Sequence, residues 1–156
     1  MLSSKENALK DLQLNKLIDN ATTVSYSIGK IDKLISQQLS EALLEVGVSL
    51  PQFTMLSNLH LHGEMANAKL ASRSFISPQA SNQIVKTMEE RGWISKSDDP
   101  NHGRILLIAL TPEGQEVYEK CKIKSMGFES RMLAGLPAEN VLMLKATVQR
   151  MISNLK

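Results

Sequence analysis

Four polar side chains recur at helical spacing after residue 77, and together they can donate and accept hydrogen bonds. They are Gln79, Asn82, Gln83 and Lys86. The Gln and Asn amides match the adenine edge in a major groove, whereas Lys suits guanine or a phosphate. The pattern therefore favours contacts to nucleic-acid bases, and a polar helix face that contacts only water is the alternative interpretation.

The segment that carries these side chains is predicted to be a helix over residues 77–91. Ser77 suits the cap of its first turn, Pro78 the first helical position and Gly92 the stop. The opposite face is expected to pack against a core, because apolar groups recur there at helical spacing. That face comprises Ala80, Ile84, Val85, Met88 and the stem of Arg91.

The preceding residues predict a second, shorter helix. Residues 67–74 are expected to be helical, with Leu70 and Ala71 facing inward. Phe75 and Ile76 would then form an apolar turn that leads into the next helix. Two helices joined by so short a turn make a helix-turn-helix arrangement.

The residues that follow predict a β-hairpin. Residues 93–96 and the apolar run 104–110 are expected to be strands, and the loop 97–103 between them is polar and contains Pro and Gly. A hairpin placed directly after a helix-turn-helix is a candidate wing, which is a second element that can contact DNA.

Residues 52–114 resemble the MarR family of bacterial winged-helix regulators. The order and spacing of six short motifs together carry the resemblance. The motifs are Leu50-Pro51-Gln52-Phe53, Leu70-Ala71, Ser77-Pro78-Gln79, Met88-Glu89-Glu90-Arg91-Gly92, Asp99-Pro100-Asn101-His102-Gly103-Arg104 and Leu110-Thr111-Pro112-Glu113-Gly114.

The resemblance implies a mainly α fold with a small β-wing and a role in transcription. In this family, a homodimer binds a pseudo-palindromic operator in double-stranded DNA, most often as a repressor, and small aromatic or phenolic acids often release it. The whole chain, 1–156, would be one MarR-type domain. Dimerisation helices are expected at about 15–46 and 112–156, and a DNA-binding lobe at about 50–111 with its wing at about 93–110.

The expected DNA contacts combine the polar helix face with flanking residues. Ser77 and Arg73 are placed to reach phosphates, and the helix face to reach bases. The full set is Arg73, Ser77, Gln79, Ser81, Asn82, Gln83, Lys86, His102 and Arg104.

The wing departs from the family pattern. The family usually has Asp-x-Arg there, with the acid bracing the arginine, but this chain has His102-Gly103-Arg104. Either Asp98 or Asp99 takes over as the brace, or Arg104 is ordered by a narrow, electronegative minor groove. His102 either adds a second cation when protonated near its usual pKa or occupies a solvated loop tip.

Apolar residues recur along both ends of the chain. They predict a long helix to about residue 45, a capping box at Ser49 and Gln52, a helix start at Thr111 and a last helix from Pro137. The apolar faces of the first and last of these helices are larger than a small lobe can cover. A second copy of the chain is the simplest partner for them. The apolar residues are Leu17, Ile18, Ala21, Val24, Ile28, Ile31, Ile35, Leu39 and Leu43, and then Val141, Leu142, Leu144, Val148, Met151, Ile152 and Leu155.

Composition excludes several other classes of protein. A net charge of +2 over 156 residues is low for a nonspecific DNA binder, so cations must be placed locally. No signal pattern or membrane-length apolar run is present, which favours a cytoplasmic protein. The lone Cys121 forms no internal disulfide and is expected to be a small buried apolar residue, with redox sensing as the alternative.

Enzymatic and metal chemistry find little support in the sequence. His60 and His62 stand two apart and point in different directions on a helix, so we expect no metal site and no cofactor. No motif of a hydrolase, metalloprotease or phosphate-binding loop is present, so we expect no enzyme. The competing function is a noncatalytic winged-helix adaptor that binds another protein.

Overall fold

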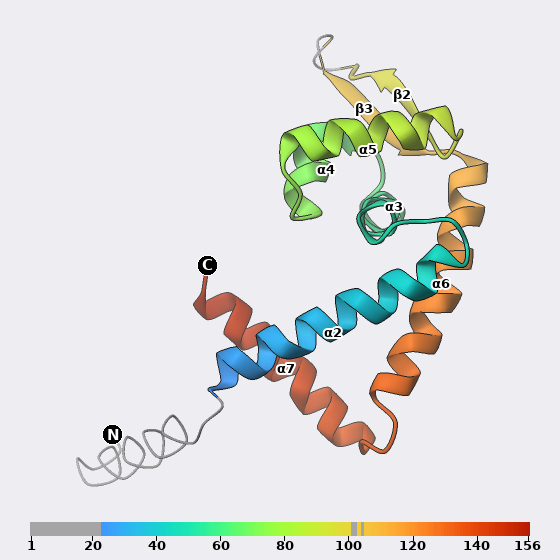
Figure 1. Ribbon diagram of the computed structural model, residues 1–156. Helices are drawn as coiled ribbons and strands as arrows, with labels where there is room; N and C mark the ends of the chain where they lie inside the picture. Colours follow the sequence, from blue (N-terminus) through green and yellow to red (C-terminus); the bar gives the residue numbers. More distant parts are fainter. Residues whose placement is uncertain (1–22, 101–102, 104) are drawn as a thin grey trace, which may run out of the picture. The chain divides into compact units, whose positions relative to one another are not determined.

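The computed structural model describes residues 23–100, 103 and 105–156 (Figure 1). Most of these residues are helical, and the chain divides into two compact units, residues 1–38 and 39–156. In order, the elements are α2 (Val24–Leu44), α3 (Leu50–His62), β1 (Met65–Ala66), α4 (Asn67–Arg73), α5 (Pro78–Glu90), β2 (Ile94–Asp98), β3 (Leu106–Leu110), α6 (Pro112–Met132) and α7 (Ala138–Asn154). The predicted fold class, mainly α with a small β-wing, is confirmed.

The long first helix begins at Val24 in the described residues. Thr23 Oγ1 accepts a hydrogen bond from the N–H of Tyr26 at 3.2 Å. The helix ends at Leu44, and Gly47 follows with a φ of 71°, as the sequence predicted. The expected start near residue 15, with Leu17, Ile18 and Ala21, lies outside the described residues. The part of α2 within the first unit leaves large apolar side chains exposed: Val24, Tyr26, Ile28, Ile31 and Leu34.

Side-chain caps begin three helices of the second unit, as expected. Ser49 and Gln52 form the predicted capping box, in which Gln52 Oε1 accepts from the Ser49 N–H at 2.9 Å. Ser77 Oγ accepts from the N–H of Ala80 at 3.2 Å, and Thr111 Oγ1 accepts from the N–H of Gly114 at 3.0 Å. Each cap satisfies a backbone donor that has no partner inside its helix, so each fixes where the helix starts.

The sheet has three antiparallel strands in the order β1-β3-β2. Ile94 pairs with Leu110 and Asp98 with Leu106, which confirms the predicted hairpin. Met65 of β1 pairs with Ile108. A two-residue strand carries no periodic signal, so β1 was not predicted from the sequence.

The hydrophobic core of the second unit lies among α3, α4, α5, α6 and the inner residues of the sheet. Its buried members come from nearly every element after residue 39: Leu43, Val48, Met55, Leu56, Leu59, Met65, Leu70, Val85, Met88, Ile94, Ile108, Tyr118 and Cys121. These residues hold α4 and α5 against the sheet, and so they fix which face of α5 remains outside.

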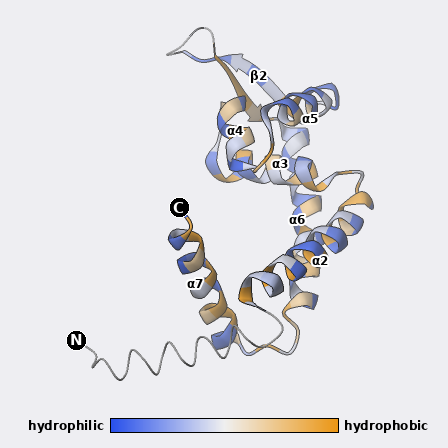
Figure 2. Cartoon of the chain, turned by 60° about the vertical axis from the view of Figure 1, so that its left-hand side comes forward, coloured by the Kyte–Doolittle hydropathy of each residue, from blue (hydrophilic) through white to orange (hydrophobic). Residues whose placement is uncertain are grey.

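The last helix is not part of this core. Helix α6 ends at Met132 with Leu133 as its C-cap, Gly135 follows with a φ of 81°, and α7 starts after Pro137, close to the predicted positions. Helix α7 has no buried residue, although hydrophobic residues, coloured orange in Figure 2, are frequent along it. Within the described ranges, no helix is both long enough and apolar enough to cross a membrane.

Candidate nucleic-acid interface

Helix α5 has the two unlike faces that the sequence predicted. Val85 and Met88 are buried in the core, and Ala80 and Ile84 are partly buried. The four polar side chains of the opposite face, Gln79, Asn82, Gln83 and Lys86, are all exposed. Packing on one side therefore presents amide donors and acceptors and one ammonium group on the other.

Arg91 differs from the expectation that its stem faces the core. It is exposed, its Nη1 donates to the Gly47 carbonyl at 2.9 Å, and its guanidinium lies 4.9 Å from the centre of the Trp93 ring. A guanidinium keeps its charge in water while its planar surface stacks on an aromatic ring. Arg91 thus links the end of α5 to the turn at Gly47.

Ser81 is not a direct contact, which corrects the expectation from the sequence. It has 0% exposure, so its side chain cannot reach a base edge in this conformation. Its hydroxyl donates to Asn67 Oδ1 at 2.6 Å, and Asn67 Nδ2 donates to Asn82 Oδ1 at 2.6 Å. Sequence reasoning missed Asn67, because no periodic pattern links the first residue of α4 to α5.

The turn between α4 and α5 places two further candidates at the surface. Arg73 is the last residue of α4, Ser77 is the cap of α5, and both are exposed. The first turn of α5 has no acidic residue, so its free N–H groups and positive dipole end face no neighbouring carboxylate there. This arrangement suits a phosphate.

The expected apolar turn is only half correct. Ile76 packs against the core, but Phe75 is 97% exposed and has a φ of 54°. The N–H of Ile76 donates across Phe75 to the Ala71 carbonyl at 3.0 Å. That hydrogen bond closes a helix-ending turn whose left-handed position is usually filled by glycine.

The lysine of the polar face has only a weak internal partner. Lys86 Nζ lies 3.9 Å from Glu90 Oε1, and the Lys86 side chain is 76% exposed. An ion pair between side chains this exposed contributes little, because water screens it and both chains lose freedom in forming it. Lys86 is therefore available to an outside anion.

The wing is described up to its tip. Asp99 N–H donates to the Ile105 carbonyl at 2.8 Å, and Lys96 forms an ion pair with Glu89 of α5. That pair ties the hairpin to the end of the helix. His102 and Arg104, the two expected wing contacts, lie outside the described residues, as does the choice of brace for Arg104.

His60 and Cys121, the other side chains that could take part in chemistry, are packed against neighbouring residues of the fold. The His60 ring stacks on Tyr118 with ring centres 4.1 Å apart, and its Nδ1 lies 3.0 Å from Gln115 Oε1. Burial raises the pKa of the Cys121 thiol to about 11, so it stays protonated at neutral pH. Among the residues that the structure describes, no group of three or more His, Cys, Asp and Glu side chains could hold a metal ion.

A short helix, a tight turn, a helix with an exposed polar face and an antiparallel hairpin together define a winged helix-turn-helix domain. The model of the MarR family matches residues 48–106, which include α4, α5 and β2 and reach the first residue of β3. Residues 48–106 therefore form a winged helix-turn-helix domain of the MarR type.

Individual relatives agree with this assignment. The HTH-type transcriptional repressor Rv2887 of Mycobacterium tuberculosis strain H37Rv is 25% identical over 138 residues, which cover 88% of this chain and 99% of that protein. The apo structure of wild-type MarR from E. coli has a TM-score of 0.75 at 18% identity and covers 85% of this chain and 98% of its own. The M. tuberculosis Rv2887 complex with salicylic acid has a TM-score of 0.70 at 23% identity and covers 85% and 98%.

Proposed function

We propose that this protein is a homodimeric transcription regulator that represses by binding a pseudo-palindromic operator and that releases DNA when it binds a small aromatic acid. The observation that carries the proposal is the exposed polar face of α5, which lies opposite an apolar face that packs against the core. A helix held in this way presents its amides in a fixed orientation, which base recognition requires.

Each part of the interface has a chemical role in this proposal. Gln79, Asn82 and Gln83 contact base edges, because an amide can pair with the donors and acceptors of the major groove. Lys86 contacts guanine or a phosphate, and Arg73 and Ser77 contact phosphates. Arg104 contacts the minor groove from the wing, where narrow grooves attract cations. His102, when protonated, adds a second cation beside the phosphates.

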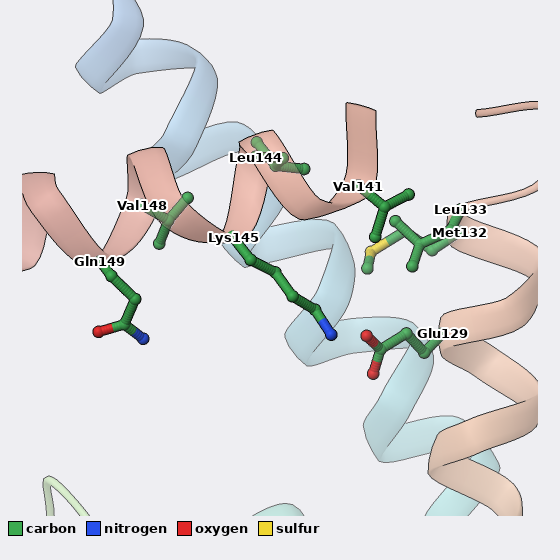
Figure 3. A pocket seen from close by; sticks show the side chains of 8 residues that line it. All are labelled: Glu129, Met132, Leu133, Val141, Leu144, Lys145, Val148 and Gln149. Carbon is green, nitrogen blue, oxygen red and sulfur yellow. The ribbon is translucent and has the colours of Figure 1, made fainter. Parts of the chain in front are cut away.

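A second copy is proposed to cover the terminal helices. A cavity of about 480 Å³ lies between α6 and α7, and Figure 3 shows apolar side chains along it, with Glu129 and Lys145 also on its wall. Soluble proteins rarely leave long apolar stripes in water, so these faces suit an interface between protomers. The lining residues are Glu129, Met132, Leu133, Val141, Leu144, Lys145, Val148 and Gln149.

The proposed effector class rests on the related repressor. The Rv2887 structure contains salicylic acid, an aromatic acid. A thermal-shift screen of small aromatic and phenolic acids tests this part, because a ligand that binds the folded state raises its melting temperature. The effector should also weaken operator binding, whereas non-aromatic acids of the same charge should do neither.

Selection from random DNA duplexes, followed by binding measurements on the selected sequence and a scrambled one, tests the DNA-binding function. Wild type should prefer the selected duplex, and Gln83→Ala should lose about 1–3 kcal/mol of that preference, the value of one good amide–base contact. Dimerisation should be unchanged. Equal preference in wild type and variant would leave Gln83 as a solvated side chain.

Salt dependence separates phosphate contacts from base contacts. Lys86→Ala should weaken binding to both duplexes and lower the salt slope by about 1, because one fewer counterion is released. Lys120→Ala removes another exposed charge, on α6, and should change neither value. If wild type binds no duplex even at low salt, the adaptor function becomes the better interpretation.

A further inference from the structure

A chain of three polar side chains connects α4 to the recognition face of α5. Ser81 Oγ donates to Asn67 Oδ1, and Asn67 Nδ2 donates to Asn82 Oδ1, both at 2.6 Å. Ser81 is fully buried and Asn82 is exposed. The chain of hydrogen bonds therefore runs from the core to the surface that faces DNA in the proposed function.

The hydrogen bonds run in one direction in this structure, from the buried Ser81 hydroxyl through Asn67 to Asn82. A buried hydroxyl needs a partner, and the Ser81 hydroxyl donates its proton to Asn67 Oδ1. Asn67 Nδ2 is therefore available to donate to Asn82. Because Nδ2 can only donate, Asn82 accepts this hydrogen bond with its amide oxygen.

This hydrogen bond limits what Asn82 can offer to a base. A two-bond contact to adenine needs the amide oxygen for N6–H and the amide nitrogen for N7. Here Oδ1 is turned toward α4, so Nδ2 is the group that points away from it. Asn82 then presents a donor, which matches the two acceptors of guanine, N7 and O6, better than the single acceptor of thymine, O4, or of adenine, N7, and finds no acceptor on cytosine.

We propose that Asn67, a residue outside the recognition helix, is a specificity-determining positioning residue: it fixes the Asn82 amide as a donor and so makes Asn82 select an acceptor-rich base, guanine above all. This inference rests on the proposed function, because it concerns how that same site reads DNA.

Reversing the hydrogen bond tests the proposal. In Asn67→Asp, one carboxylate oxygen still accepts from Ser81, but the other can only accept, so the Asn82 amide must turn and donate to it. Asn82 Oδ1 then faces DNA. At the base pair that Asn82 contacts, the variant should prefer a base with an exocyclic amine, cytosine or adenine, in place of guanine. The ratio of the two affinities should change by on the order of tenfold.

Selection from random duplexes with four proteins measures this change. Asn82→Ala locates the base pair concerned, because preference flattens there alone. Asn67→Asp should switch the preferred base at that pair and at no other. Ala68→Asp is the matched control, since it adds the same charge at the neighbouring exposed position and should keep the wild-type base.

Ser81→Ala provides a second variant that keeps the charge unchanged. It frees the Asn67 amide to rotate, so preference at the same pair should broaden rather than switch. Circular dichroism melting shows that each variant is folded.

Three results would overturn the inference. They are a wild-type preference for cytosine or adenine at this pair, an unchanged preference in Asn67→Asp, and an equal switch in Ala68→Asp. If wild type selects a consensus that Asn82→Ala leaves intact, only this inference fails. If wild type selects no consensus at all, the proposed function fails with it.

Discussion

The winged lobe and the last helix differ in where their apolar side chains lie. In the lobe, α3 and α5 begin at Ser49 and Ser77, and each buries one face in a shared core. Helix α7 also begins at a clear signal, Pro137, but buries no residue. The lobe is therefore complete within one chain, whereas α7 has an apolar stripe that its own unit does not cover.

This difference teaches how the two regions gain their stability. Burial of apolar area is the main favourable term in folding, and short isolated helices are marginal in water. The lobe obtains that term from its own residues. In the proposed function α7 obtains it from a second copy, so we expect its stability to depend on protein concentration, whereas that of the lobe core should not.

The largest expected effect is on α7. Leu144→Glu combined with Val148→Glu places two charges on the apolar stripe, and burying an unpaired charge costs several kcal/mol. The dimer should weaken at least about 100-fold, enough to appear as a monomer in light scattering at micromolar concentration.

Arg150→Glu is the control for this change. It alters the charge of the same helix at an exposed position off the apolar stripe, and it should leave the dimer intact. A folded Leu144→Glu/Val148→Glu protein that remains dimeric would move the interface away from α7.

An intermediate effect is expected where the wing meets α6. A Cβ at Gly114 would lie 1.9 Å from the Trp93 carbonyl oxygen and 2.8 Å from its carbonyl carbon, so its two nearest neighbours are backbone atoms. Gly114→Ala should therefore lower the free energy of unfolding by on the order of 1–3 kcal/mol, the cost of overpacking, in urea unfolding at fixed protein concentration.

Gly127→Ala provides a matched change in the same helix. Its added Cβ would meet only the flexible end of Arg131, 3.9 Å away. This variant should be neutral or slightly stabilising, because alanine favours helix more than glycine does. Equal stability of the two variants would mean that the chain around Trp93 relaxes freely, and that the lobe is less tightly packed than its core indicates.

The same difference explains how much could be predicted from the sequence. The caps at Ser49, Ser77 and Thr111 and the two faces of α5 follow from local spacing, and the structure contains all of them. Asn67 could not be found in this way, because its role depends on how α4 crosses α5. Strand β1 could not be found either, because two residues are too few to form a periodic pattern. Its pairing with β3 also depends on residues far along the chain.

The smallest expected effect concerns Phe75, which lies in the lobe but has an exposed apolar side chain, as many residues of α7 do. It is 97% exposed, so its side chain contributes almost no packing. Its exposure has a different cause, however. The turn that ends α4 requires a left-handed backbone, with a φ of 54°, at this position. A left-handed conformation costs most residues roughly 1–2 kcal/mol, and Asn tolerates it better than Phe.

Phe75→Asn should therefore raise the free energy of unfolding by about 0.5–1 kcal/mol, because it relieves backbone strain and loses no contact. Phe75→Val should lower it, because β-branched side chains are least tolerant of positive φ. Urea unfolding compares the two variants, and light scattering follows their assembly. If the strain explanation holds, both variants dimerise like wild type. If Phe75→Asn instead weakens the dimer as charges on α7 do, Phe75 belongs to the same interface, and the boundary between the self-sufficient lobe and the partner-dependent surface runs through the turn before α5.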